Sequence, residues 1–228
     1  MFRSALLSLT VLAPLAFATS ASLAHGNGPV FSQDHTRVYL PHGIPSNDGL
    51  AKLPWKLADC RPGHWPWWCD YGYQKATMFP FMGYTVAALN SNVGQMSQAM
   101  QVTAQTNLAV SGLSVGIGYI SGTNSINLAI YSDAGGVPGT LLASGDAAGL
   151  PAFGSCCDLP SVKFRRTKLT AGTPYWIVVS TDGESPDTVV AAEDNTIDEV
   201  DPASMAYNTG SGWTAYPGLP AFSFSFIK

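Results

Sequence analysis

The sequence LSVGIGYISGTNSINLAI, from Leu113 to Ile130, alternates apolar residues with small or polar ones on both sides of a turn. The apolar positions are Leu113, Val115, Ile117 and Tyr119 before the turn, and Ile126, Leu128 and Ile130 after it. A period of two is typical of β-strands that bury one face, and Gly122-Thr123-Asn124 has the composition of a tight turn. The stretch therefore predicts a β-hairpin with one buried face.

Short alternating or apolar runs, separated by turn residues, continue this pattern towards the C-terminus. They cover residues 95–104, 141–143, 162–164, 175–180, 188–192, 203–208, 213–216 and 221–227, with a loop at 133–139. No run shows a sustained helical period, and the crossover helices of a parallel sheet are missing. The predicted fold class is therefore all-β, a jelly-roll-like antiparallel β-sandwich. Phe222, Phe224 and Phe226 are expected inside it, because exposed phenylalanines would invite edge pairing.

The N-terminus has the features of a secretory signal peptide. Arg3 supplies a positive charge, an apolar run covers residues 5–18, and small residues follow at Ala21 and Ala24. The run is too short for a membrane span and no second one follows, so no integral membrane segment is expected in the mature chain. Residues 1–24 are predicted to be removed, and the product is predicted to be secreted to the periplasm or the outside of the cell.

The charge balance argues against nucleic-acid binding. The net charge is −4 and charged residues make up 11% of the chain, below the usual quarter, so there is no basic footprint for phosphates. The polar surface must consist mainly of Ser, Thr, Asn and Gln, as is common in secreted β-proteins.

Residues 25–84 differ in composition and hydrophobic pattern from residues 85–228, which we assign to the sandwich. They hold all four histidines and four of the six tryptophans, with frequent prolines and no long periodic stretch. We interpret the segment as an irregular arm that packs on the sandwich and is clamped by a disulfide.

Four cysteines in an exported chain predict two disulfides. We favour Cys60–Cys69, which would close a short loop, together with a bridge between the adjacent Cys156 and Cys157. Four cysteines allow three pairings, and the sequence does not choose among them. A zinc site is the alternative, but the spacing differs from the usual zinc-ligand patterns.

The string IGYISGTNSINLAIYSDAGGVPG, residues 117–139, resembles the choice-of-anchor R type domain of secreted and surface bacterial proteins. GSCCDL at 154–159, LTAGTPYWIVVSTD at 169–182 and the tail from Asp201 to Phe226 fit the same resemblance, which covers roughly residues 95–228. The resemblance implies a jelly-roll-like sandwich with structural rather than catalytic motifs. Such domains are often followed by a sorting anchor. No apolar tail precedes Lys228, so a free soluble product is expected.

Two motifs carry possible enzyme chemistry. Gly112-Leu113-Ser114-Val115-Gly116 matches G-x-S-x-G, but it lies inside an alternating β run and every histidine precedes Ser114, so we expect an ordinary strand. Cleavage after Ala24 would leave His25 as the first residue. Its amine and imidazole, with a second histidine such as His64, His35 or His42, would suit copper(II), as in lytic polysaccharide monooxygenases, which also start with histidine.

An aromatic loop gives the strongest binding signal. Its candidate ligand-binding residues are Trp65, Trp67, Trp68, Tyr71 and Tyr73. Tryptophan and tyrosine rings present large apolar faces with a polar edge, which suit the C–H faces of sugar rings. A disulfide-clamped loop would be preorganised, which lowers the cost of ordering on binding. The alternative is that these rings anchor the arm to the sandwich.

Eight of the fifteen acidic residues fall between Asp182 and Asp201. Calcium binds carboxylate and carbonyl oxygens, so Asp194, Asp198 and Asp201 are candidate calcium ligands. No D-x-D-x-D-G loop is present, and a solvated acidic face, partly balanced by the basic residues at 163–168, is the alternative.

These observations favour a secreted, non-catalytic β-sandwich that binds carbohydrate or another cell-surface or extracellular component through the aromatic loop. A copper-dependent oxidative enzyme using His25 is a second hypothesis, and a self-assembling structural surface protein is a third. No cofactor is certain; calcium and copper are the candidates.

Overall fold

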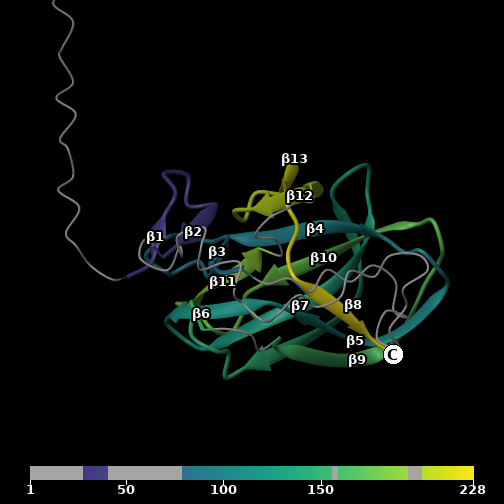
Figure 1. The fold of residues 1–228 in the computed structure, drawn as a ribbon, viewed down its shortest axis with the longest axis horizontal. Coiled ribbons are helices and arrows are strands. Elements are labelled where there is room, and N and C mark those ends of the chain that lie inside the picture. Colours follow the sequence, from purple (N-terminus) through teal and green to yellow (C-terminus); the bar gives the residue numbers. More distant parts are fainter. Residues whose placement is uncertain (1–27, 41–78, 156–158, 195–201) are drawn as a thin grey trace, which may run out of the picture.

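The computed structural model describes residues 28–40, 79–155, 159–194 and 202–228 (Figure 1). These residues form fourteen β-strands and no helix, as the sequence predicted. The strands pair antiparallel throughout the three sheets. The all-β, antiparallel fold class is therefore confirmed.

The largest sheet has six strands. Their order is β13 (Trp213–Pro220), β12 (Pro202–Asn208), β4 (Ser97–Thr103), β10 (Pro174–Ser180), β7 (Ser125–Asp133) and β8 (Pro138–Ala148). The second sheet has five strands, in the order β1 (Val30–Phe31), β2 (Arg37–Tyr39), β3 (Phe79–Ala87), β11 (Val189–Asp194) and β6 (Ile117–Ser121). The third has three strands, in the order β14 (Phe224–Ile227), β5 (Leu108–Val115) and β9 (Ser161–Leu169).

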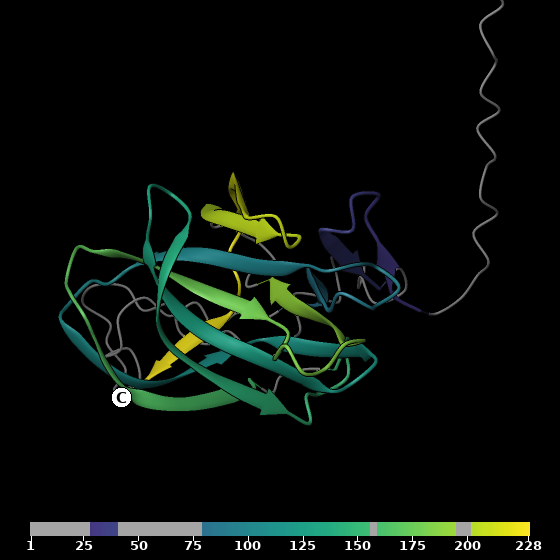
Figure 2. The same cartoon turned by 180° about the vertical axis from the view of Figure 1, so that it is seen from behind.

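The five-stranded and three-stranded sheets join into one layer at Gly116, between β5 and β6. The Gly116 amide donates to the Ser223 carbonyl at 2.9 Å, and the Glu193 amide donates to the Gly116 carbonyl at 2.8 Å. The Ser223 amide donates to the Glu193 carbonyl at 3.2 Å, which closes the seam. This combined layer packs against the six-stranded sheet and makes the sandwich (Figures 1 and 2).

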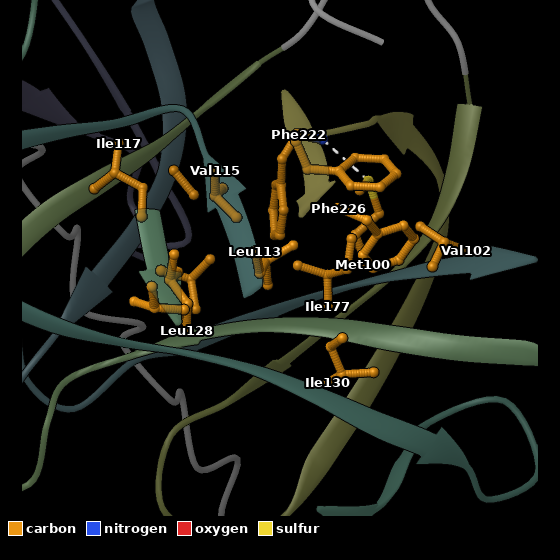
Figure 3. Packing of buried hydrophobic residues seen from close by; sticks show 14 of the residues in the cluster. Met100, Val102, Leu113, Val115, Ile117, Leu128, Ile130, Ile177, Phe222 and Phe226 are labelled. Atoms are coloured by element: carbon orange, nitrogen blue, oxygen red, sulfur yellow. Dashed lines mark hydrogen bonds between the residues drawn. The ribbon is translucent and has the colours of Figure 1, made fainter. Parts of the chain in front are cut away.

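The core lies between the two layers. Met100, Leu128 and Ile177 of the six-stranded sheet pack in the same buried cluster as Leu113 and Val115 of the opposite layer (Figure 3). Full burial of each such side chain contributes about 1.5–3 kcal/mol relative to exposure. Alternation along each strand is what directs one set of side chains into this space.

The three phenylalanines near the C-terminus lie inside the sandwich, as predicted. Phe222, Phe224 and Phe226 are all at most 4% exposed. Phe222 and Phe226 approach Met100 in the core, where the Phe222 amide faces the Met100 sulfur at 3.1 Å (Figure 3). The intervening Ser223 is also buried, because its backbone forms the seam described above.

The predicted hairpin around Gly122 does not form, although both of its strands do. β6 pairs with β11 in the five-stranded sheet, whereas β7 pairs with β10 and β8 in the six-stranded sheet. The turn, where Gly122 has a φ of 78°, therefore carries the chain from one layer to the other. An alternating pattern shows only that each strand buries one face. Two strands that face each other across a core meet this condition, and so do two strands paired in one sheet.

The described part of the N-terminal segment belongs to the five-stranded sheet. β1 and β2 form a small antiparallel pair, and β2 continues onto β3. β3 crosses the boundary expected between residues 84 and 85, with Tyr84 and Val86 both in the main core. Residues 41–78, which contain the expected disulfide clamp at Cys60 and Cys69, lie outside the described residues.

Candidate functional site

Most of the predicted site residues lie outside the described part of the chain. They are the aromatic residues Trp65, Trp67, Trp68, Tyr71 and Tyr73; the histidines His25, His42 and His64; the acids Asp198 and Asp201; and all four cysteines. The binding, copper and disulfide predictions therefore remain predictions. Of the candidate histidines, His35 is described, and its Nδ1 lies 3.1 Å from the Val93 carbonyl oxygen, in a turn with a φ of 58°.

Ser114 lies near the C-terminal end of β5, paired with Ser161 of β9 and Ser225 of β14. The G-x-S-x-G motif therefore stays within a sheet and does not form the strand–turn–helix that a hydrolase nucleophile requires. The neighbours Leu113 and Val115 point into the core, so Ser114 faces outward.

Asp194, the described member of the calcium set, takes part in a buried ion pair. Its Oδ2 accepts a hydrogen bond from Nη2 of Arg37 at 2.5 Å, and the two side chains are 5% and 22% exposed. Its Oδ1 is buried and has no hydrogen-bond partner among the described residues. Within those residues no group of three or more His, Cys, Asp or Glu side chains could hold a metal ion.

An aromatic ring supports this ion pair. Arg37 lies opposite Tyr84 in the β2–β3 pair, and Tyr84 lies opposite Ala192 in the β3–β11 pair. Side chains opposite each other share a face of the sheet, so the guanidinium must cross Tyr84 to reach Asp194. Its Cζ stands 4.1 Å from the centroid of the Tyr84 ring, which is the geometry of a cation–π contact.

The aromatic contacts extend from Tyr84 to the six-stranded sheet. Tyr84 meets Phe222 edge-on at 5.5 Å and stacks with Tyr216 at 6.4 Å between ring centroids. Tyr216 also stacks with Tyr207 at 5.2 Å. These contacts join strands from both layers around the buried charges.

Gln98 of β4 connects the layers with hydrogen bonds. Its Nε2 donates to the backbone carbonyls of Thr85 at 2.9 Å and of Thr36 at 3.3 Å. Its Oε1 accepts from the Tyr216 hydroxyl at 2.5 Å. Gln98 is fully buried, so these three bonds replace the water that the amide loses on folding.

Burial dominates the electrostatics of this cluster. It raises the pKa of Asp194 to about 6, although the Arg37 charge acts in the opposite direction. It also raises the pKa of Tyr84 and of Tyr216 above the ordinary tyrosine range, again opposed by Arg37. Replacing both members of a buried ion pair with apolar residues is often neutral for stability, whereas removing one member is strongly destabilising.

Glu193 is the second buried carboxyl group. It is 1% exposed, and neither carboxyl oxygen has a hydrogen-bond partner among the described residues. Glycines flank it on both sides: Gly83 is its register partner on β3, and a Cβ on Gly118 of β6 would stand 2.9 Å from Oε1. Burial, with a smaller contribution from the charge of Asp194, raises the pKa of Glu193 to about 8. Glu193 is therefore mostly a neutral acid at pH 7.

The two carboxyl groups do not form a catalytic pair. Asp194 meets Arg37 on the face that carries Tyr84, whereas Glu193 contacts Gly118 beside Phe153, which belongs to a separate cluster on the outer face. Glycoside hydrolysis by two carboxylates needs both groups to face one bond. This arrangement therefore suits a structural role.

The outer face of the six-stranded sheet carries a second polar and aromatic group. Trp176 is fully buried, and its Nε1 donates to Oδ1 of Asp133 at 2.8 Å, while Gln101 Nε2 donates to the same oxygen at 2.9 Å. These bonds lower the pKa of Asp133, the Trp176 bond most. Tyr131 and Trp213 pack partly buried against the same cluster and keep some ring surface exposed.

Sequence reasoning missed the cluster of Arg37, Tyr84, Gln98 and Tyr216 because its members come from four distant segments. One local signal existed. The run VVAAED from Val189 to Asp194 continues from buried apolar residues into two acids without a turn residue. Acids at the end of a buried strand predict burial of the acids themselves, which requires a partner or a shifted pKa.

Among the described residues no helix is long and apolar enough to cross a membrane. No known protein-family model matches the chain, and no curated protein matches it.

Proposed function

We propose that this protein is a secreted, non-catalytic β-sandwich that binds carbohydrate or another extracellular component. Trp65, Trp67, Trp68, Tyr71 and Tyr73 are the proposed contact residues. The observation that carries the proposal is their density, with three tryptophans in the four positions from 65 to 68. So many large rings in one short segment exceed what a single buried anchor needs, and exposed rings of this kind stack on sugar faces.

The described residues support a binding role over a catalytic one. The two carboxyl groups with strongly raised pKa values point to opposite faces of one sheet, and one of them is held by Arg37. Ser114 of the hydrolase-like motif lies within a sheet. The resemblance to choice-of-anchor R type domains, which implies structural motifs, points the same way.

The sandwich offers a rigid support for such a surface. Its core joins strands of both layers, so the outer faces are fixed relative to each other. A Cys60–Cys69 disulfide, which we favour, would preorganise the aromatic segment and lower the entropy cost of binding.

Retention on insoluble polysaccharides and binding to a broad glycan array test this function. The combined Trp67→Ala and Trp68→Ala variant should lose at least tenfold in affinity, since each stacked ring contributes about 1–3 kcal/mol by analogy with stacking on bases. The thermal unfolding transition should stay unchanged. Trp213→Ala is the matched control, because it removes one partly exposed ring from the folded sandwich.

Full retention by the double variant would reject the aromatic segment as the contact surface, and loss in Trp213→Ala alone would move the surface to the six-stranded sheet. Failure of the unmodified protein to bind any glycan would reject the proposed function.

A further inference from the structure

Four of the five exposed basic residues in the described ranges lie on one strand. Lys163, Arg165, Arg166 and Lys168, four of the eleven basic residues of the chain, all lie on β9 and are exposed. In the part of the chain that the structure describes, none of the four makes an ion pair; the pair recorded there joins Arg37 and Asp194.

These charges are two, one and two residues apart, and a register shift between Val110 and Gly112 of β5 interrupts the alternation opposite them. Val162 and Leu169 point into the core, so Lys163 and Lys168 lie on the outer face opposite Gly112 and Ala109 of β5. Residues two apart on a strand are about 6.8 Å apart, so the four charges span about 17 Å. Neighbouring charges are therefore closer than the Debye length of about 8 Å at physiological salt, and their potentials add.

The strand beside these charges, β5, carries small residues, one of which is covered by Ile227 of β14. The β5 residues that face outward next to β9 are Ala109, Gly112 and Ser114, and Ser114 lies opposite Ser161. Gly112 is tightly enclosed by the Val162 carbonyl and the Ile227 side chain, so no larger residue fits there. An extended chain could lie along β9 itself with its anionic groups beside the exposed cations.

Protection of a sheet edge does not explain the charges. Lysines on edge strands commonly prevent pairing with other chains. Here the free edge of β9 is already beside β8, since a Cβ on Gly145 would stand 3.0 Å from the Lys163 carbonyl oxygen. The four cations therefore indicate binding of a partner rather than prevention of strand pairing with another chain.

We propose that the outer face along β9 binds a linear acidic polysaccharide through Lys163, Arg165, Arg166 and Lys168. This inference rests on the proposed function and names its ligand class. Charge complementarity selects an anionic polymer. The net charge of −4, with eight acids between Asp182 and Asp201, disfavours densely charged duplexes, which need more phosphate contacts. Ile227 packs beside Gly112, and Leu141 and Leu142 of the neighbouring β8 are exposed. Anionic lipid vesicles are therefore the competing ligand, and tighter binding to them than to polygalacturonate at equal salt would overturn the inference.

The test uses one glycan backbone in two charge states: polygalacturonate and its fully methyl-esterified form. Titration calorimetry at about 50 mM NaCl compares the unmodified protein with a variant that carries Lys163→Ser, Arg165→Ser, Arg166→Ser and Lys168→Ser. The variant should bind polygalacturonate at least tenfold more weakly and the neutral ester equally well. Raising NaCl to about 200 mM should weaken the unmodified protein by at least tenfold and the variant far less, because fewer counterions are released.

A second variant controls for net charge. Asn90→Asp, Asn92→Asp, Thr209→Asp and Ser211→Asp add four negative charges at exposed positions between β3 and β4 and between β12 and β13. β12 and β13 lie on the far side of the sandwich from β9 (Figures 1 and 2). Both variants lower the formal net charge of −4 by four. The control should keep its affinity for polygalacturonate within about threefold; an equal loss in both variants would overturn a local site on β9.

Three other outcomes overturn the inference and separate it from the proposed function. Binding of the neutral ester alone would reject the acidic ligand and leave carbohydrate binding intact. Binding of neither glycan form, with no glycan bound on the array, would reject both. Tighter binding to duplex DNA than to polygalacturonate at equal salt would reassign the basic strand to nucleic acid.

Discussion

The five-stranded and three-stranded sheets lie in one layer, yet they hold their charged residues under opposite conditions. In the five-stranded sheet, Arg37, Glu193 and Asp194 are largely removed from water and surrounded by aromatic or apolar groups. In the three-stranded sheet, the cations of β9 are exposed and make no ion pair with a described residue.

The difference shows what burial does to a charge. A charge removed from water depends on one partner and on its protonation state, so it links folding to pH. A solvated charge contributes little to stability but can attract an oppositely charged partner. Binding through such a charge therefore depends on the salt concentration. We therefore expect mutations in the first sheet to change unfolding and mutations in the second to change binding.

The largest expected effect follows removal of Arg37. Arg37→Met keeps most of the side-chain volume but leaves Asp194 buried without its cation. Breaking a buried pair from one side costs about 3–5 kcal/mol of unfolding free energy. Urea denaturation at pH 7 measures it.

Lys168→Met is the matched control, since it removes an exposed cation from β9 and should change the unfolding free energy by less than about 0.5 kcal/mol. The double variant Arg37→Met with Asp194→Leu should recover most of the loss, because the uncompensated charge is gone. Equal effects of Arg37→Met and Lys168→Met would contradict the comparison between the two sheets.

The next effect concerns the pH dependence of stability. The folded pKa of Glu193, about 8, lies above its ordinary value of 4.5, so the native state holds a proton that the unfolded chain releases. The contribution of Glu193 to the unfolding free energy is therefore complete below about pH 4.5. It falls by about 1.4 kcal/mol per pH unit as the pH rises to 8. Asp194, with a pKa raised to about 6, adds to this fall between about pH 4 and 6.

Glu193→Gln keeps the shape and cannot ionise. The unfolding free energy of this variant, relative to that of the unmodified protein, should rise by on the order of 3 kcal/mol between pH 4.5 and pH 7. Urea midpoints measured from pH 4.5 to 8.5 report the gain, with the exposed Glu184→Gln as control. Parallel pH profiles for Glu193→Gln and the unmodified protein would show that the buried carboxyl group is not the cause.

The sequence predicted strand positions well because period-two alternation is local. The burial of Phe222, Phe224 and Phe226 follows from that pattern and is confirmed. The loop predicted at 133–139 is present but shorter, since β7 ends at Asp133 and β8 begins at Pro138. The pairing of strands is not local, which is why the hairpin around Gly122 was wrong. Alternation marks which face is buried and leaves open which sheet holds the strand.

The candidate sites show the same limit. The charge of β9 was visible as a basic run between residues 163 and 168, but only the fold shows that all four side chains are exposed and that β8 packs against the edge of the strand. The contact between Arg37 and Asp194 joins residues 157 positions apart, so no sequence window contains both. A pattern can predict that a buried acid needs a partner, whereas the partner's identity requires the fold.

The smallest of these effects tests burial with a single hydroxyl group. Tyr216→Phe removes the donor to Gln98 Oε1, and Gln98 is fully buried with its Nε2 already bonded to two carbonyls. The orphaned oxygen should cost about 1–2 kcal/mol in urea unfolding. Tyr119→Phe is the matched control, because the Tyr119 hydroxyl donates to the exposed Gly122 carbonyl at 2.6 Å, where water can replace it. That variant should lose less than about 0.5 kcal/mol. Equal losses would show that the hydroxyl itself, rather than the burial of its acceptor, sets the cost, which would contradict the dependence on burial argued for Arg37 and Lys168.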